Sequence, residues 1–256
     1  MKKMIKTLPA LALLTLLTGC VVYVGGDTAT ADQHIEKELT LDSQNLTELI
    51  ADTTAGNIRV VGVDNTDKIH VKADIYTNEE LEYTLSLTRQ GNKAKLVADH
   101  DVQDGLVFHI NQGLSIDLVI TMPKDLMLEL DDSSGDIVIE GLSNDIHIED
   151  GSGDLSLNGG RSVFIDDGSG DINIQNVKEN LSVDDGSGDI RIHNVNGFVE
   201  VSDSSGNLTV KNVSKHVKID DGSGDITVQT AGSLIIEEDG SGSLNVDDIQ
   251  GEVTIK

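Results

Sequence analysis

Hydrophobic and polar residues alternate in short runs through the second half of the chain. Ile172 and Ile174 form one apolar pair and Leu181 and Val183 form the next, with Val177 between the two pairs. Strict alternation of β-branched residues predicts strands, and the Gly, Asn, Asp and Ser residues that bound each run are turn formers. Each unit therefore contains two short strands and two corners.

These units recur at a fixed period. An acidic residue, Ser, Gly and usually Asp recur seven times, with the glycines 17 or 18 residues apart at Gly135, Gly153, Gly170, Gly188, Gly206, Gly224 and Gly242. A constant period of about 20 residues is typical of stacked solenoids. The one 17-residue step keeps its apolar pairs, so we expect the missing residue in the second corner, near Gly159 and Gly160.

The pattern predicts an all-β protein, a single-stranded β-helix or solenoid with coils of about 18 residues and two short strands in each coil. A single coil cannot offset an ordering cost of roughly 1.5 kcal/mol per residue, so the coils must stack and bury columns of Ile, Val and Leu. We expect regular repeats over residues 126–256, with a departure from register at 234–237.

Residues 35–125 are also β-rich but less regular. The segment 54–63 is a degenerate copy of the repeat, which predicts a first coil or cap. Alternating segments follow, with hairpin turns expected at 90–93 and 111–113. We expect these strands to broaden and cap one end of the solenoid, and we expect no helix in the mature chain.

The amino terminus carries a leader. Lys2, Lys3 and Lys6 precede an apolar run over residues 8–17, which closes on Leu17-Thr18-Gly19-Cys20. An ordinary secretory leader or a transmembrane helix is the alternative, but the run is too short to span a bilayer. The segment resembles a bacterial lipoprotein signal.

That resemblance implies a signal peptide over 1–19, cleavage before Cys20, and lipid, palmitate included, on Cys20, the only cysteine of the chain. Residues 20–34 would form the lipidated terminus and a short tether, and the protein would lie in the cell envelope. Val21 follows the cysteine, which favours the outer membrane in a Gram-negative host and leaves the outer face of the plasma membrane for a Gram-positive one.

The charge of the chain narrows its partners. Removal of residues 1–19 takes three of the 18 basic side chains and none of the 45 acidic ones, which leaves a net charge of −30. Such a surface repels phosphate backbones and anionic lipid headgroups. We therefore exclude nucleic acid as a partner and expect membrane attachment through the lipid alone.

Stacking should align aspartates in two columns on the outside of the solenoid, at the Gly-Ser-Gly corner. One column would hold Asp136, Asp154, Asp171, Asp189 and Asp225, and the other Asp132, Asp150, Asp167, Asp185, Asp203, Asp221 and Asp239. Like charges about 5 Å apart repel by roughly 1 kcal/mol in water, and calcium would relieve that repulsion. Alternatively, Asp and Ser bond the amides of the turn while solvent screens the charge. Asn207 and Ser243 interrupt the first column, which a turn tolerates better than a metal array does.

Catalysis has less support. A β-helix lyase or hydrolase acting on polysaccharides needs a groove with paired carboxylates or bases and, commonly, aromatic rings. The two Phe residues of the repeats, Phe164 and Phe198, are assigned here to the core or a corner. The repeat-region histidines fall at different points of the cycle, so we expect solvated side chains that do not stack on one another, at His147, His193 and His216. We predict no catalytic residue.

The leader, the strand-rich start, the Met122-Pro123-Lys124-Asp125 entry and the repeated Ser-Gly-Asp-Ile coils resemble a family of domains of unknown function described as "putative adhesins" (DUF4097), over about residues 35–256. The resemblance implies a β-solenoid and no catalytic residues. The corners are also similar to calcium-binding nonapeptide repeats, although only one corner per coil has their glycine and aspartate pattern. We expect a non-enzymatic envelope lipoprotein with an adhesin-like binding or scaffold role, a protein or glycan ligand, and calcium as candidate cofactor. The polysaccharide-processing enzyme is the alternative.

Overall fold

The computed structural model describes residues 22–23, 33–77, 82–100 and 114–256. The leader, Cys20, most of the tether and the turn expected at 111–113 lie outside these residues. The described residues form 21 strands joined by turns, and none of them is helical. Accordingly, they include no helix that could cross a membrane.

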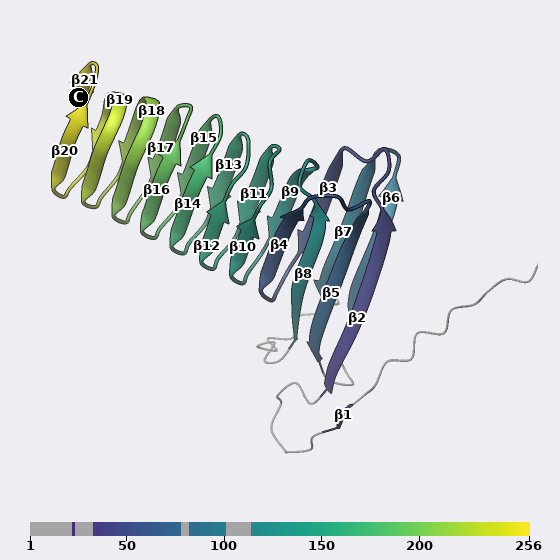
Figure 1. Cartoon of the computed structure of the whole chain (residues 1–256). Coiled ribbons are helices and arrows are strands. Elements are labelled where there is room, and N and C mark those ends of the chain that lie inside the picture. Colours follow the sequence, from purple (N-terminus) through teal and green to yellow (C-terminus); the bar gives the residue numbers. More distant parts are fainter. Residues whose placement is uncertain (1–21, 24–32, 78–81, 101–113) are drawn as a thin grey trace, which may run out of the picture.

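Two parallel sheets wind into the solenoid (Figure 1). The strands of the first sheet in the repeat region are β9 (Met127–Asp132), β11 (Ile146–Asp150), β13 (Val163–Asp167), β15 (Leu181–Asp185), β17 (Val199–Asp203) and the later parts of β18 (Leu208–Asp221) and β19 (Ile226–Asp239), followed by β21 (Val253–Ile255). The strands of the second sheet are β10 (Ile137–Glu140), β12 (Leu155–Asn158), β14 (Ile172–Val177), β16 (Ile190–Val195), the earlier parts of β18 and β19, and β20 (Leu244–Ile249).

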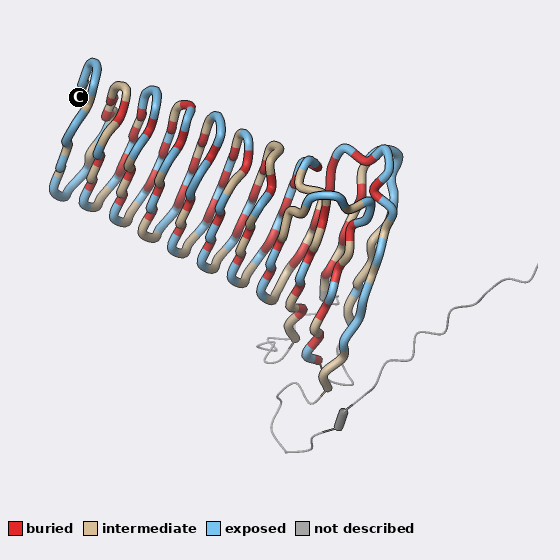
Figure 2. Tube along the Cα trace, in the orientation of Figure 1, coloured by how far each residue is buried: buried red, intermediate tan, exposed pale blue. Residues whose placement is uncertain are grey.

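Successive coils stack residue over residue. Ile172 of β14 pairs with Ile190 of β16, and Ile190 pairs in turn with Leu208 of β18. All three side chains are buried, and the tube in Figure 2 alternates between buried and more exposed positions along the strands from β9 to β17. The predicted solenoid and its inward aliphatic columns are therefore confirmed.

The amino-terminal strands broaden the solenoid at one end. They are β1 (Val22–Tyr23), β2 (Gln33–Asp42), β3 (Glu48–Thr53), β4 (Ile58–Val63), β5 (Lys68–Thr77), β6 (Tyr83–Gln90), β7 (Lys93–His100) and β8 (Ser115–Pro123). β3 and β4 lie parallel to β9 and β10, which confirms that segment 54–63 belongs to a first coil. β2 and β8 flank β5 in antiparallel pairings, and β6 and β7 form the hairpin expected at 90–93.

Two irregularities match the sequence. Asn158 pairs with Gln175 and Val163 pairs with Leu181, so the residue missing from the short step lies at the corner between Asn158 and Val163, as predicted. In β19, the expected departure from register reduces to local shifts. Leu234 remains buried opposite Val217 of β18, and the pairing shifts by one residue between Ala231 and Ser233 and shifts back just after Ile236.

The Gly-Ser-Gly corners bring the backbones of neighbouring coils into close contact. Gly188 has a φ of +151°, and a Cβ placed there would lie 1.8 Å from the carbonyl oxygen of Gly170 in the preceding coil. Only glycine combines that backbone conformation with that approach. The repeated glycine is therefore a packing requirement of the stack.

We expect Gly188→Ala to lower the free energy of unfolding by about 2–5 kcal/mol, because the methyl group forces two coils apart at a strained φ. Gly91→Ala is the matched control. Gly91 also has a positive φ, of +65°, but nothing lies within 4 Å of its added Cβ, so its cost should be about 1 kcal/mol. Urea denaturation of both variants measures the difference, and equal losses would contradict the close-contact explanation.

Candidate functional site

The second predicted aspartate column is buried, so the expectation that both columns face solvent is wrong. Its members end the strands of the first sheet, where Val163, Ile165 and Asp167 share the inward face of β13. The alternation that buries the two aliphatic residues buries the aspartate as well. We call the members with exposures of 0–5% the inner column: Asp132, Asp150, Asp167, Asp185, Asp203 and Asp221. Asp239, in the last coil, is only partly buried.

Each inner-column carboxylate has one satisfied oxygen. Asp185 Oδ1 accepts a hydrogen bond of 3.0 Å from the backbone N–H of Ser187, and the same bond recurs from Asp150 to Asp221 at 2.9–3.3 Å. Asp132 instead accepts from the hydroxyl of Thr53 at 2.7 Å. The second oxygen, Oδ2, is buried in all six residues and has no hydrogen-bond partner among the described residues.

This burial disfavours the ionised form. Desolvation is the largest cause, and it raises the pKa of Asp150 and Asp185 to about 7 and that of Asp167 and Asp203 to about 6. Neighbouring carboxylates raise these pKa values further, for example Asp167 and Asp203 acting on Asp185. The inner column therefore retains protons at a pH where ordinary aspartates have lost them.

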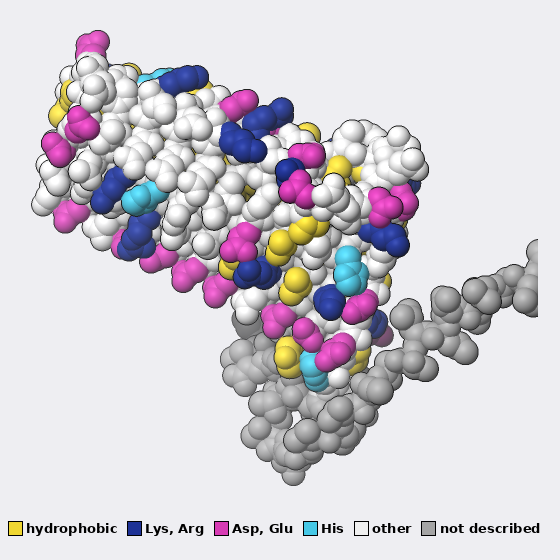
Figure 3. Space-filling model, viewed as in Figure 1, with side chains coloured by type: hydrophobic (Ala, Val, Ile, Leu, Met, Phe, Trp, Pro, Cys, Tyr) yellow, Lys and Arg dark blue, Asp and Glu magenta, His cyan; other side chains and the backbone are white. Residues whose placement is uncertain are grey.

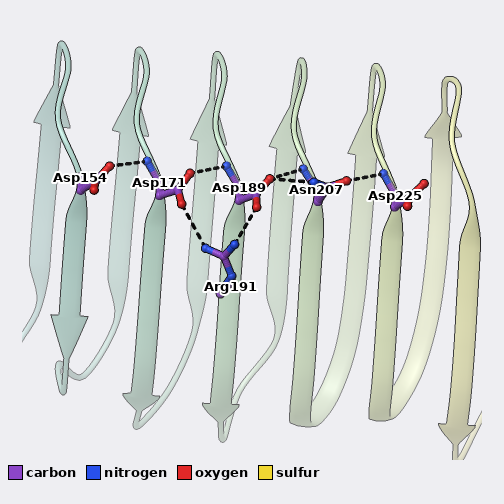
Figure 4. Close-up of polar contacts among 6 residues, drawn as sticks. All are labelled: Asp154, Asp171, Asp189, Arg191, Asn207 and Asp225. Carbon is purple, nitrogen blue, oxygen red and sulfur yellow. Dashed lines mark hydrogen bonds and ion pairs between the residues drawn. The ribbon is translucent and has the colours of Figure 1, made fainter.

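We call the first predicted column the outer column. Hydrogen bonds relieve the repulsion between its carboxylates. Figure 4 shows Asp154, Asp171, Asp189 and Asn207 reaching the backbone of the following coil. Asp171 Oδ1 accepts a hydrogen bond of 3.0 Å from the N–H of Asp189, and Asp189 Oδ1 accepts one of 3.1 Å from Asn207. Asn207 continues the ladder because its amide oxygen accepts from the N–H of Asp225 at 3.2 Å. An asparagine therefore does not break this column.

Asp189 of the outer column is held in its charged form. The N–H of Asn207 is the largest cause that lowers the pKa of Asp189, and Arg191 contributes as well. The guanidinium of Arg191 bridges Asp171 and Asp189 at 3.2 and 2.6 Å. Hydrogen bonds thus favour the charged form of Asp189, whereas desolvation favours the neutral form of the inner-column aspartates.

These contacts support the turn interpretation for both columns. Among the described residues, no three of the twelve aspartates bring ligand oxygens within 4.8 Å of one another. Calcium binding by either column stays a prediction.

A hollow of about 370 Å³ lies next to the inner column. Three exposed carboxylates that the sequence analysis missed border this hollow, namely Asp131, Glu149 and Asp166.

A second hollow lies on the outward face of the first sheet, over β11, β13 and β15. Its volume is about 310 Å³, and its lining includes the rings of Phe164 and Phe198 and the side chains of Asn180 and Ser182. Phe164 is 39% exposed, so its assignment to the core or a corner is wrong. We call this feature the Phe164 hollow. The sequence could have indicated this hollow, because Phe164 stands between Val163 and Ile165, which face inward, and must therefore face outward.

Two of the histidines also differ from expectation. His147 stacks on Phe164 with ring centroids 4.6 Å apart, and His216 stacks on Phe198 at 5.0 Å. The histidines do not stack on one another, as predicted, but these two pack on rings in neighbouring coils and are not simply solvated. Each phenylalanine therefore has one face covered by a histidine.

We expect the protein to be more stable in acid than at alkaline pH. The inner-column pKa values are raised in the folded state, so their contribution is complete below about pH 4, the unfolded value, and is lost as the pH rises through 6–7. Asp185→Asn, which removes the buried charge, should increase the free energy of unfolding at pH 8 by about 1–3 kcal/mol and change it little at pH 4.

Guanidinium denaturation at pH 4 and pH 8 measures this effect. Asp184→Asn is the control, since Asp184 is the exposed neighbour of Asp185 on the same strand. It should change stability by less than about 0.5 kcal/mol at either pH. A wild-type protein that is more stable at pH 8 than at pH 4 would contradict protonation of the inner column.

Solved structures similar to this chain share low sequence identity with it. A "putative lipid binding protein" from Parabacteroides distasonis is 16% identical, with 86% of this chain and 96% of that chain covered and a TM-score of 0.46. A "putative adhesin" from Parabacteroides merdae is 13% identical, with 84% and 95% covered and a TM-score of 0.43. Another from Bacteroides fragilis is 17% identical, with 86% and 97% covered and a TM-score of 0.40.

Comparison with curated proteins found no match. The model of the family described as Toastrack DUF4097 matches residues 36–255, which include all of β3 to β21. The match spans both the amino-terminal antiparallel strands and the regular coils. The chain therefore belongs to the Toastrack DUF4097 family.

Proposed function

We propose that this protein is a non-enzymatic, adhesin-like lipoprotein of the cell envelope that binds a glycan at the Phe164 hollow. The observation that carries the proposal is an exposed aromatic ring on a rigid outward sheet face, bordered by polar side chains. Binding sites typically combine apolar or aromatic walls with a few placed polar groups. A protein ligand at the same hollow is the competing outcome.

The dimensions of the hollow support a sugar ligand. Phe164 lies on β13 and Phe198 lies in the corner just before β17, on coils that are two steps, or about 9.6 Å, apart along the stack. Asn180 and Ser182 belong to the coil between them, and these small and polar side chains leave the floor low and offer hydrogen-bond donors and acceptors. The apolar face of a sugar ring can rest on a phenyl face while its hydroxyls reach these groups.

The same hollow supports a binding role over the alternative of a polysaccharide lyase or hydrolase. Asp145 is the one carboxylate in its lining, whereas glycoside hydrolysis ordinarily uses two. Arg161 holds Asp145 in two contacts of 2.7 and 2.5 Å, and this hydrogen bonding lowers the pKa of the carboxyl group. Asp145 is therefore not suited to act as a general acid.

Attachment to the envelope follows from the leader. Lipid on Cys20 would anchor the chain at its amino terminus, and the acidic surface would keep the solenoid away from anionic headgroups (Figure 3). The first described strand after the tether is β2, which lies at the broadened end of the solenoid. In a Gram-negative host we place this anchor in the outer membrane.

We expect the protein to bind a subset of the glycans on an array. The double variant Phe164→Ala and Phe198→Ala should weaken that binding by roughly 5–100-fold, because each stacking contact contributes about 0.5–1.5 kcal/mol. Val119→Ala is the control, since Val119 is also 39% exposed but lies on β8. Unchanged glycan binding by the double variant, or binding of a protein alone, would refute the glycan site.

We expect mass spectrometry of the mature protein to show an amino-terminal Cys20 that carries acyl chains, and membrane fractions to contain the protein. Cys20→Ser removes the acceptor thiol, so the variant should lack acyl chains and lose membrane attachment. A mature terminus at a different residue, or membrane attachment that survives Cys20→Ser, would rule out the lipoprotein assignment.

A further inference from the structure

A histidine and two carboxylates converge on the outward face of the antiparallel pair β2 and β5. The register places Glu36 of β2 opposite Asp74 of β5, with His34 two residues before Glu36 on the same strand. Side chains two residues apart on a strand and those directly across from them share one face of a sheet. One ligand atom from each of His34, Glu36 and Asp74 lies within 4.8 Å of the other two.

The histidine is already oriented toward this cluster. His34 Nε2 lies 3.1 Å from Asp74 Oδ1, and the ring of Tyr76 stacks on the imidazole at 4.7 Å with an interplanar angle of 12°. Tyr76 is the residue directly across from His34 in the strand register. A neighbouring aromatic ring that holds a histidine in place reduces the cost of ordering it around an ion.

The ligand types select the ion. Zinc binds imidazole nitrogen and carboxylate oxygen at about 2.0–2.2 Å, and two ligands of a tetrahedral zinc are therefore about 3.3 Å apart. The separation of 3.1 Å between His34 Nε2 and Asp74 Oδ1 is close to that value. Calcium and magnesium prefer shells made of oxygen alone, so the imidazole favours a zinc-like ion over them.

The local charge also favours a cation. Within the described part of the chain Glu36 makes no ion pair, and the nearest basic side chain along β5, Lys72, is engaged with Glu38 at 3.6 Å. His70 also faces Glu38, at 3.5 Å. Figure 3 shows histidines beside acidic side chains over these amino-terminal strands, at the surface of the molecule. The side chains of His34 and Asp74 are 40% and 47% exposed and Glu36 is exposed, so the three ligands are accessible to an ion from solvent.

We propose that His34, Glu36 and Asp74 form a binding site for a zinc-like divalent ion, separate from the Phe164 hollow and from both aspartate columns. The three side chains supply one imidazole nitrogen and two carboxylate oxygens, and the fourth tetrahedral position stays open to water or to a ligand on another molecule. Tyr76 is a positioning residue, since it touches the histidine and not the ion.

Calorimetric titration of zinc into the full-length protein in detergent tests the site. All variants carry Cys20→Ser, which removes the only thiol, a competing zinc ligand. We expect saturable binding of one zinc per chain and a melting temperature that rises with zinc. His34→Ala should abolish both effects, and Asp74→Asn should weaken binding by more than the roughly 10–100-fold that loss of an outer-shell partner costs.

His147→Ala is the matched control. His147 also stacks on an aromatic ring and lies 3.2 Å from a carboxylate, Glu149, but no third ligand joins them in the described residues. Zinc binding should be the same in this variant as in the parent. Absence of saturable zinc binding, full binding by His34→Ala, or equal losses in His34→Ala and His147→Ala would each overturn the proposal, the last by showing general attraction to an acidic surface.

Discussion

The stacking of one backbone coil on the next, in exact residue register, is the constraint on which the rest of this structure depends. At Gly188 the coils approach so closely that a single added methyl group would overlap a carbonyl oxygen. The same close contact recurs at Gly170, Gly206 and Gly224, so these corners lie directly above one another. A residue type that occurs once per coil is therefore placed above its own copy. This produces the aliphatic columns and the two aspartate columns. It also produces a ladder of side-chain hydrogen bonds at the second corner, through Asn176, Asn194 and Asn212.

The two aspartate columns show that identical stacking can give opposite electrostatic results. In the outer column each carboxylate accepts an N–H from the next coil, and Asp189 is held in its charged form. In the inner column the available N–H belongs to the same turn and satisfies one oxygen only, so Asp185 holds a proton to higher pH. The repulsion expected from the sequence is thus relieved by hydrogen bonds in one column and by protonation in the other.

The period of the glycines was sufficient to predict the fold. In a repeat, each residue pairs with its copy in the next coil, whereas the pairing register of unrepeated strands cannot be deduced from the sequence. The location of the short step at Gly159 and Gly160 could be predicted for the same reason. Burial of Asp185 was missed because an aspartate beside a glycine is typical of a turn, whereas here it completes the inward face of a strand. The pairing of His34 with Asp74 could not be predicted, because β2 and β5 occur once and their register has no repeated copy.

This difference explains where specific sites can arise in such a molecule. A residue that repeats in every coil forms a column, and a column has no single point that differs from the next, so it contributes stability and general charge. A specific ligand needs a feature that occurs once. Phe164 and Phe198 occupy positions held by other residue types in neighbouring coils, and the cluster around His34 lies where the coils give way to antiparallel strands. Both candidate sites therefore lie where the repeat is broken, on a scaffold that the repeat makes rigid.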